Sequence, residues 1–343
     1  MRAAVWYSNR EVRLEERPLP QIGAGEVLLR IEASGICGSD VMEWYRRGKA
    51  PLILGHEVSG VVEKTGEDVR GWKAGDRVVA SHHVPCGSCH YCQTGHETAC
   101  ETLLSKTKFD PGGFCEHVRL FPINVEKGLF KLPEGISFEE GTFAEPLGCV
   151  LRGQRKAGLK PGSSVLVLGS GISGLLHIHL ARAMKSGTVV ATDVSDYRLN
   201  AAKRFGADLA VRAPDYSPEI FRKANNGRLA DIVIVCAGAL AAVGQALKSV
   251  ERGGTVLFFA PTMPGEMVPL SVIETFWRTD VTLTTSYAAA PSDFTGALAL
   301  IASGRLKLSE MITHRLRLAE TGLGFKLVAE ASDSIKVIIE PQR

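Results

Sequence analysis

From about residue 160 to about residue 260 the sequence repeats one unit, in which an apolar strand is followed by a short turn and a helix. We expect the strands in the stretches VLVL, TVVATD, ADIVIV and GTVLFF. Strands that alternate with helices form a parallel sheet, because each helix returns the chain to the same end of the sheet and covers one of its faces. This part of the chain is therefore expected to be a doubly wound α/β domain.

The first 150 or so residues follow a different pattern. The stretches GEVLLRIEASGI, HEVSGVVEKTG and DRVVASHHV are short runs of Val, Ile and Leu that are interrupted by Gly, which is typical of an all-β domain with irregular loops. A chain of 343 residues is long enough for two such domains. The last fifty or so residues contain an amphipathic helix and the strand SIKVIIEP, which either extend the parallel sheet or return to the first domain.

The charge balance excludes some classes of function. The chain carries 40 Lys and Arg against 37 Asp and Glu, a net charge of +3, which is too small for the basic surface that nucleic-acid binding usually needs. No stretch of about 18 residues is apolar and free of charge. The N-terminus has charged residues from its second position and no apolar segment typical of a signal peptide. We therefore expect a cytoplasmic protein that binds neither nucleic acid nor a membrane.

A glycine-rich turn follows the first strand of the α/β part, and it fits the pattern GxGxxG. Such glycines let a pyrophosphate approach the backbone, and the next helix directs free N–H groups at it. The pattern alone also fits a tight turn in any α/β protein. Asp193 ends the next strand, where its carboxylate would accept hydrogen bonds from the adenosine ribose. Together they predict a dinucleotide site, whose candidate residues are Gly169, Gly171, Ile172, Ser173, Gly174 and Asp193.

The residues around Asp193 favour NAD over NADP. Its carboxylate would repel the extra phosphate of NADP, and residues 194–197 include no Lys or Arg. Arg198 either stacks on the adenine or is a solvated helix residue. Cys236 ends the next strand, at the sheet edge where ligands of such domains bind, and is either a cofactor contact or a small buried filler.

Four of the eight cysteines lie within fifteen positions of one another. Four thiolates on one loop suit Zn²⁺, which they bind tetrahedrally in a closed shell. An iron–sulfur cluster is the alternative, but no proline follows the fourth cysteine. We expect a structural zinc held by Cys86, Cys89, Cys92 and Cys100. The histidines nearby are expected to be exposed or to lie beside ligands rather than to be ligands, and they are His82, His83, His90 and His96.

A second set of metal donors precedes this loop. Cys37 stands in GICGSD, and His56 and Glu57 stand in GHE, nineteen positions later. A lone Cys or His is more often a buried core residue than a ligand. Here, however, a sulfur, a nitrogen and an oxygen donor occur together. All three lie near glycines and precede a nucleotide-binding domain, and this combination indicates a second and open zinc site.

The order of these motifs resembles that of the zinc-containing medium-chain dehydrogenase/reductase family, above all its sorbitol and threonine dehydrogenase branch. The motifs are GICGSD, GHE, the four-cysteine loop, PGGFCEH, FAEPLGC and LVLGSGISG. The resemblance implies that Cys37 and His56 hold a catalytic zinc together with an acidic residue. It matches Glu145 to that acidic ligand and Glu57 to a residue that enters the coordination shell or is itself a ligand.

The same resemblance implies roles in proton transfer and cofactor binding. Ser39 would accept the proton of the alcohol, Ser286 would line the nicotinamide, and Lys336 would lie near the cofactor. The family often has a histidine as the outer proton relay, five positions after the first ligand cysteine. This chain has Met42 there, which cannot carry a proton, so Asp40, Glu43 or water is left to serve.

The resemblance also implies a fold and a function. The fold would be α/β, with a GroES-like β-rich catalytic domain of residues 1–152 and 290–343 and a Rossmann domain of residues 153–289. The protein would be an NAD-dependent oxidoreductase with one catalytic and one structural zinc per chain, in a homotetramer or dimer. It would oxidise a secondary alcohol of a polyol, sugar, cyclitol or amino-hydroxy compound to a ketone.

Three alternatives remain beside this reading. One is an L-threonine 3-dehydrogenase-type activity. A second is a zinc-free enoyl or quinone reductase on the same fold, which would lack the donors Cys37, His56 and Glu57. The third is a non-catalytic, zinc-stabilised protein that binds nucleotides or nucleic acid.

Overall fold

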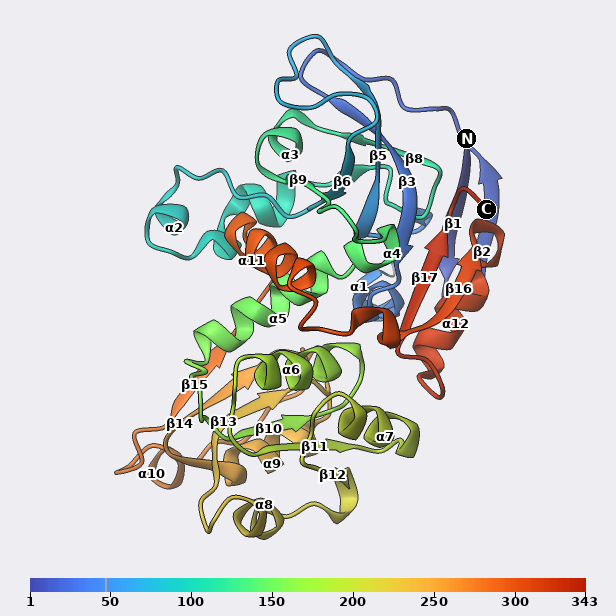
Figure 1. The fold of residues 1–343 in the computed structure, drawn as a ribbon. Helices are drawn as coiled ribbons and strands as arrows, with labels where there is room; N and C mark the ends of the chain where they lie inside the picture. Colours follow the sequence, from blue (N-terminus) through green and yellow to red (C-terminus); the bar gives the residue numbers. More distant parts are fainter. Residues whose placement is uncertain (47) are drawn as a thin grey trace. The chain divides into compact units, whose positions relative to one another are not determined.

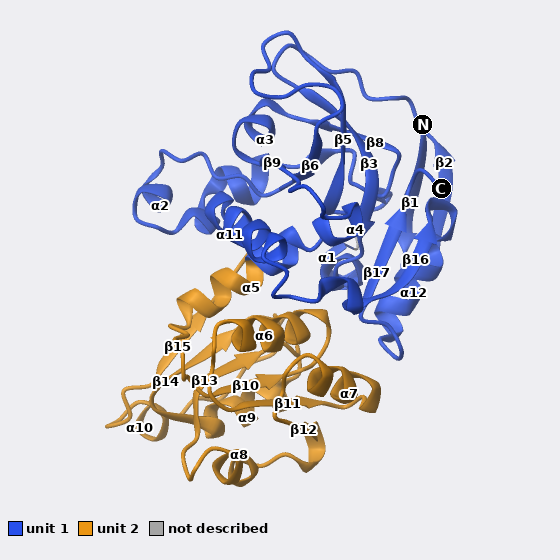
Figure 2. Ribbon diagram, in the orientation of Figure 1, with its two compact units in different colours: residues 1–148, 288–343 blue, residues 149–287 orange. Residues whose placement is uncertain are grey.

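The computed structural model describes residues 1–46 and 48–343, which form two compact units (Figure 2). Unit 1 comprises residues 1–148 and 288–343, and unit 2 comprises residues 149–287. The sequence boundary between them falls inside helix α5 (Ala144–Lys156). Among the helices that the structure describes, none is both long enough and apolar enough to cross a membrane.

Unit 1 is built on two sheets (Figure 1). The larger sheet has the strand order β16-β17-β3-β5-β6-β9, with β8 paired to β3 and β7 to β8, and the smaller sheet has the order β2-β1-β4. The strands are β1 (Arg2–Ser8), β2 (Glu11–Glu16), β3 (Val27–Gly35), β4 (Leu52–Ile53), β5 (Glu57–Thr65), β6 (Arg77–Ala80), β7 (Phe109–Asp110), β8 (His117–Leu120), β9 (Leu129–Lys131), β16 (Ile312–Arg317) and β17 (Lys336–Glu340).

Short helical segments connect these strands. The α-helices of unit 1 other than α5 are α1 (Glu43–Arg46), α2 (His90–Gln93), α3 (Pro122–Lys127), α4 (Phe138–Gly141), α11 (Pro291–Ala302) and α12 (Thr321–Glu330). The other helical turns are η1 (Gly38–Val41), η2 (Glu97–Ala99), η3 (Thr102–Lys106), η5 (Leu308–Met311) and η6 (Leu318–Glu320). The core of the larger sheet includes Val27, Leu29 and Ile31, every second residue of β3, because side chains alternate between the two faces of a strand.

The C-terminal segment belongs to unit 1. Strand β17 pairs antiparallel with β3, and β16 extends the sheet beyond β17. This pairing brings residues from the two ends of the chain into one sheet, so side chains near residues 35 and 336 become neighbours.

Unit 2 contains a parallel sheet with the strand order β12-β11-β10-β13-β14-β15. The first strand in the sequence lies in the middle, and the chain winds outwards in both directions, as predicted for a doubly wound domain. Helices lie on both faces of this sheet (Figure 1). The strands are β10 (Val165–Leu168), β11 (Val189–Asp193), β12 (Leu209–Arg212), β13 (Ala230–Val235), β14 (Val250–Phe258) and β15 (Thr282–Thr285). The helical segments are α6 (Ile172–Ala183), α7 (Asp196–Arg204), η4 (Ala213–Asp215), α8 (Pro218–Ala224), α9 (Leu240–Ser249) and α10 (Val272–Thr275).

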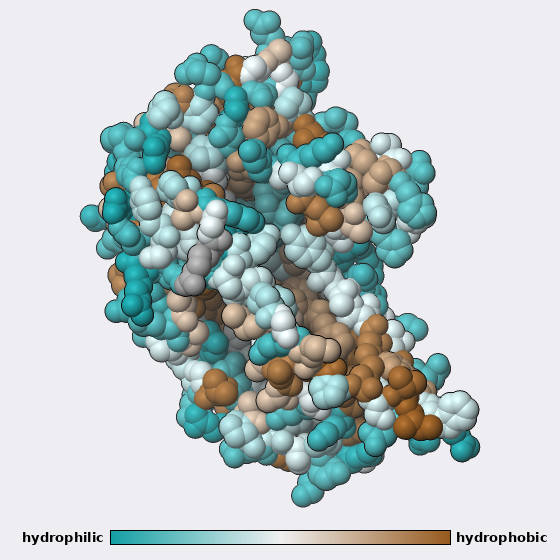
Figure 3. Space-filling model, turned by 180° about the vertical axis from the view of Figure 1, so that it is seen from behind, coloured by the Kyte–Doolittle hydropathy of each residue, from teal (hydrophilic) through white to brown (hydrophobic). Residues whose placement is uncertain are grey.

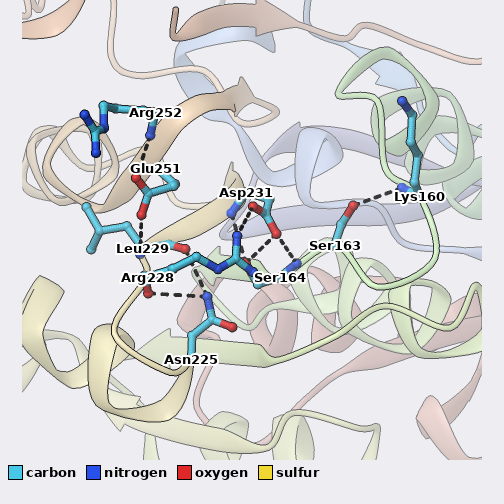
Figure 4. Close-up of polar contacts among 9 residues, drawn as sticks. All are labelled: Lys160, Ser163, Ser164, Asn225, Arg228, Leu229, Asp231, Glu251 and Arg252. Atoms are coloured by element: carbon cyan, nitrogen blue, oxygen red, sulfur yellow. Dashed lines mark hydrogen bonds and ion pairs between the residues drawn. The ribbon is translucent and has the colours of Figure 1, made fainter. Parts of the chain in front are cut away.

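A polar network fixes the start of β13 against the segment before β10 (Figure 4). The Asp231 carboxylate accepts hydrogen bonds from the backbone N–H and the hydroxyl of Ser164, both at 2.8 Å, and Arg228 lies 3.2 Å away. Glu251 accepts the backbone N–H of Leu229 at 2.8 Å. These contacts satisfy the backbone N–H groups of Ser164 and Leu229 at the amino end of the sheet.

Candidate functional site: three groups of metal donors and a dinucleotide turn

The donors Cys37, His56 and Glu57 meet at one end of the larger sheet of unit 1. Strands β3 and β5 are antiparallel, and their register places Gly35 opposite Glu57. The end of β3 therefore lies beside the start of β5, which brings Cys37, two residues after β3, next to His56 and Glu57. Strand β6 pairs with β5 so that Ala80 is opposite Val58, and His82 follows at the same end.

Cys37, His56 and Glu57 form a group that could hold a metal ion. Their donor atoms all lie within 4.8 Å of one another, so the structure brings Cys37 next to two donors that lie about nineteen and twenty positions further along the chain. Such a set leaves a further coordination position for water or substrate, as in catalytic zinc sites. The sulfur, nitrogen and oxygen of this set suit Zn²⁺.

Asp40 holds two of these donors in place. Its carboxylate accepts the backbone N–H of Cys37 at 3.0 Å and lies 3.3 Å from Nδ1 of His56. Asp40 is fully buried. Burial alone would raise the pKa of this carboxyl, but the His56 imidazole and the Cys37 N–H lower it. A carboxylate that orients a histidine in this way leaves Nε2 for a metal. No pattern in the sequence indicates this role, because the pairing depends on the fold.

Glu57 is also paired with a lysine. The Lys336 ammonium donates to the Glu57 carboxylate, and both side chains are buried, at 0% and 1% exposure. Gly35 is required at this point, because a Cβ there would overlap the Glu57 carboxylate and the Lys336 ammonium. The structure therefore places Lys336 against Glu57, within unit 1.

Glu145 lies in a second group. Its carboxylate and one ring nitrogen each of His82 and His83 lie within 4.8 Å of one another. This group adjoins the first one, since the rings of His56 and His82 have centroids 4.8 Å apart. Of the two acidic residues that were expected as ligands, Glu57 lies with Cys37 and His56, and Glu145 lies with the two histidines.

His82 and His83 are packed ring against ring, with centroids 3.7 Å apart. Burial lowers the pKa of His82 well below its ordinary value and the pKa of His83 to about 3, so both imidazoles are neutral at physiological pH. The sequence did not single these two out from His90 and His96. Their position directly after a strand that pairs with β5 is the signal that distinguishes them.

Ser39 and Met42 lie in the turn that follows Cys37. The Ser39 hydroxyl is 3.4 Å from the Cys37 sulfur, so it lies beside the metal-donor group. Met42 closes the 3₁₀ turn η1 and offers no proton-carrying atom. The Glu43 carboxylate accepts the backbone N–H of Asn9 at 2.8 Å.

The four-cysteine loop closes on itself. The Sγ atoms of Cys86 and Cys92 are 4.0 Å apart, those of Cys89 and Cys92 3.5 Å, and those of Cys86 and Cys100 3.6 Å. Four sulfurs at about 2.3 Å from a tetrahedral zinc would be about 3.8 Å from one another, so the loop fits this ion. Backbone N–H groups, including that of Cys89 at 3.4 Å, point at the Cys86 sulfur and lower its pKa to about 5.

The glycine-rich turn of unit 2 has the geometry of a dinucleotide site. Gly169 has a φ of +96° and follows β10, and Gly171 caps helix α6, whose first residues are Ile172 and Ser173. A Cβ on Gly174 would collide with the carbonyl oxygen of Gly169, so only glycine lets the helix approach the strand. Within the described part of the chain, a Cβ on Gly171 would meet only the Arg198 guanidinium, at 3.9 Å, and the positive end of α6 lies at this residue.

Asp193 ends β11 beside this turn. Its two carboxylate oxygens accept the backbone N–H groups of Ser170 at 2.7 Å and Ser195 at 2.9 Å. The carboxylate is thus fixed in orientation, and its remaining lone pairs are available to ribose hydroxyls.

Three further predicted cofactor residues lie near the same end of the sheet. The Arg198 guanidinium is about 3.9 Å from the position of a Cβ on Gly171. Cys236 follows β13 directly, and burial raises the pKa of its thiol, so it is a thiol and not a thiolate. Ser286 follows β15, and its hydroxyl is buried with no hydrogen-bond partner among the described residues.

Comparison with known families matches both units. The model described as "Alcohol dehydrogenase GroES-like domain" matches residues 23–134, and the model described as "Zinc-binding dehydrogenase" matches residues 173–303. These matches confirm the predicted fold class, a GroES-like β-rich domain with a Rossmann-type parallel sheet.

Individual proteins match over nearly the whole chain. Sorbitol dehydrogenase of Gallus gallus is 33% identical and covers 98% of this chain and 96% of its own length. A probable D-xylulose reductase A of Neosartorya fischeri is 33% identical and covers 96% of this chain and 93% of its own. Among solved structures, a putative zinc-binding dehydrogenase of Sinorhizobium meliloti, bound to NADP, is 28% identical with a TM-score of 0.87 over 99% of each chain.

Proposed function

Because the chain belongs to the zinc-containing medium-chain dehydrogenase/reductase family, we propose that it is an NAD-dependent enzyme that oxidises a secondary alcohol to a ketone by hydride transfer. The substrate class is a polyol, sugar, cyclitol or amino-hydroxy compound. The observation that carries the proposal is the group of Cys37, His56 and Glu57 donors, which lie within 4.8 Å of one another at the end of one sheet.

We assign the zinc ligands from this geometry. Cys37 and His56 supply two donors, and Glu57 supplies the third, since its oxygen lies with theirs. Glu145, which is grouped with His82 and His83, is the alternative acidic ligand. When bound there, zinc supplies a Lewis acid that lowers the pKa of an alcohol, while NAD supplies the hydride acceptor.

The proton of the alcohol leaves through Ser39. The Ser39 hydroxyl, beside Cys37, would accept a hydrogen bond from the alcohol and take its proton. The Asp40 carboxylate is already engaged by Cys37 and His56, and Glu43 by Asn9. Met42 stands where the family often has a histidine as the outer proton relay, and it cannot carry a proton. We therefore infer that water takes the proton from Ser39.

The cofactor preference follows from Asp193. A fixed carboxylate beside the glycine-rich turn accepts hydrogen bonds from a ribose and repels a phosphate in the same place. The related structure from Sinorhizobium meliloti is bound to NADP, so cofactor choice has to be measured on this chain. The residues that would bind the pyrophosphate are the backbone groups of Gly171, Ile172 and Ser173, with Arg198 beside them.

The names of the relatives favour polyols over amino acids. They are called sorbitol dehydrogenase and D-xylulose reductase. An L-threonine 3-dehydrogenase-type activity remains the alternative substrate class, because the same zinc, serine and cofactor groups would serve it.

We further propose that the protein forms a homo-oligomer. Residues 263–277 of unit 2 expose several large apolar side chains, which include Met267 at 84%, Val272 at 69%, Ile273 at 68% and Trp277 at 67%. Figure 3 shows brown, apolar side chains gathered in the lower right of the face drawn. A patch of this kind is typical of a protein interface. Light scattering would test this: a monomer at micromolar concentration contradicts it.

An assay of NADH or NADPH formation tests the enzymatic proposal. The zinc-loaded protein is offered polyols, inositols, aminocyclitols and L-threonine with NAD or NADP. We expect turnover of at least one of them, with NAD preferred, and its loss in Cys37→Ala. Absence of turnover across the panel in protein shown to hold zinc contradicts the proposal.

A further inference from the structure

Unit 1 contains a cavity of about 590 Å³ that reaches the metal-donor group. His56 lines it, and so do His82 and Asp40, while much of the remaining wall is apolar and includes Leu52, Ile53 and Phe109. Its volume is in the range of small-molecule sites, about 300–1,000 Å³. Because a ligand residue of the proposed zinc forms part of its wall, a molecule in this cavity can reach the reacting centre.

Three cationic side chains line the same cavity, and they come from three separate segments. Arg17 follows β2, Arg46 ends α1, and Lys108 precedes β7. The only carboxylate among the lining residues of this described cavity is Asp40. The lining therefore carries an excess of positive charge at one place, in a chain whose overall charge is only +3. We call it the cationic cavity.

The two guanidinium groups are only partly neutralised. Arg17 donates to Glu15 at 2.7 Å, and Arg46 lies 3.8 Å from Asp40, which is already engaged by Cys37 and His56. Nε of Arg17 and Nε of Arg46 are both buried without a hydrogen-bond acceptor among the described residues. A buried donor that lacks an acceptor is destabilising. An anion in the cavity would supply the missing acceptor, and guanidinium groups suit carboxylates and phosphates.

We propose that the substrate of this dehydrogenase carries an anionic group, a phosphate monoester or a carboxylate, which the cationic cavity binds through Arg46, Arg17 and Lys108. This inference rests on the proposed function and narrows its substrate class to anionic polyols and sugars. The anionic group does not react. The C–H bond of the alcohol carbon breaks and its hydride passes to NAD, the O–H proton leaves to solvent, and the anion keeps its charge.

Matched substrates test this directly. kcat and KM are measured for sorbitol, sorbitol 6-phosphate and gluconate, and for xylitol, xylitol 5-phosphate and xylonate. We expect kcat/KM to be at least tenfold higher for the anionic members than for the neutral polyol. A preference for the phosphates identifies a phosphate monoester as the natural group, and a preference for the sugar acids identifies a carboxylate.

Variants of the cavity supply the second arm. Arg46→Gln should lower the ratio of kcat/KM between anionic and neutral substrates by about 10- to 100-fold, mainly through KM, because a charge-assisted hydrogen bond is lost. Lys106→Gln is the matched control, since Lys106 is exposed and does not line the cavity, and it should leave the ratio unchanged. If Arg46→Gln fails to fold, Lys108→Gln replaces it.

Binding of inorganic phosphate gives a readout without turnover. Phosphate should raise the melting temperature of the zinc-loaded native protein and of Lys106→Gln, and should do so much less for Arg46→Gln. Equal or better use of the neutral polyols, with no effect of phosphate, overturns the anion proposal while the dehydrogenase function stands. No turnover of any substrate with either cofactor overturns the dehydrogenase function itself.

Discussion

Replacing Lys336 by methionine would leave the Glu57 carboxylate without its counter-charge inside the protein. Both side chains of this pair are almost completely buried, at 0% and 1% exposure. Removing one partner of a buried ion pair destabilises a protein by about 3–5 kcal/mol. For a domain of about 150–250 residues, 1 kcal/mol shifts the melting temperature by about 2–4 °C. We therefore expect metal-free Lys336→Met to melt roughly 6–20 °C below the metal-free native protein.

The metal state changes this expectation. If Glu57 is a zinc ligand, the cation compensates the carboxylate that Lys336 no longer neutralises. The zinc-loaded variant should then lose much less stability than the metal-free variant. The double variant Lys336→Met/Glu57→Gln, which carries no buried charge at this place, should recover part of the loss in the metal-free protein.

Thermal and urea unfolding of each protein, with zinc and after chelation, provides the measurement. Lys326→Met is the control, because the ion pair of Lys326 with Glu330 is exposed, at 65% and 56%, and such pairs contribute only about 0–1 kcal/mol. A loss in metal-free Lys336→Met as small as in the control would refute the reasoning about the buried pair. A loss of equal size with and without zinc would refute Glu57 as a ligand.

Three further predictions concern single residues. Ser39→Ala should slow alcohol oxidation by about 10²–10⁴-fold with little change in NAD binding; unchanged turnover in steady-state kinetics removes Ser39 from the mechanism. Asp193→Ala should raise the KM for NAD by about tenfold or more and reduce the preference for NAD over NADP. Equal use of both cofactors by the native enzyme would contradict the role of Asp193. Burial lowers the pKa of His177 to about 3 in the folded protein, whereas this side chain has an ordinary pKa of about 6.5 in the unfolded chain. As the pH falls below about 6.5, the unfolded chain therefore binds a proton that the folded protein does not. The free energy of unfolding should therefore fall by up to about 1.4 kcal/mol for each pH unit below about pH 6.5. In urea unfolding between about pH 6.5 and 4.5, the free energy of unfolding of His177→Leu should fall less steeply with pH than that of the native protein. Parallel profiles of the two proteins would argue against His177 as the cause.

Much of the fold was predictable from local patterns. The strand, turn and helix pattern after residue 160 predicts the doubly wound sheet, because periodicity and glycine placement are local properties. The cysteine spacing likewise predicts the closed metal loop, since its four sulfurs lie on one segment. The Gly-interrupted apolar runs predict that the first domain is rich in β-strands, and the family resemblance added that it is GroES-like.

The contacts around the open metal group were not predictable in the same way. The pairing of Lys336 with Glu57 joins residues 279 positions apart and depends on the register of β17, β3 and β5. His82 and His83 join the site through the pairing of β6 with β5. Strand register is set by the whole sheet, so a single sequence does not reveal it.

Zinc content tests the central claim, that the chain has one closed and one open zinc site, most directly. Zinc is measured per chain in the native protein, in Cys37→Ala and in Cys115→Ala, whose cysteine is fully buried and lies outside the three groups of metal donors found among the described residues. We expect about two zinc ions in the native protein and in Cys115→Ala, and about one in Cys37→Ala with no alcohol oxidation. One zinc in the native protein, with turnover unaffected in Cys37→Ala, would contradict the open zinc site as the place of the reaction.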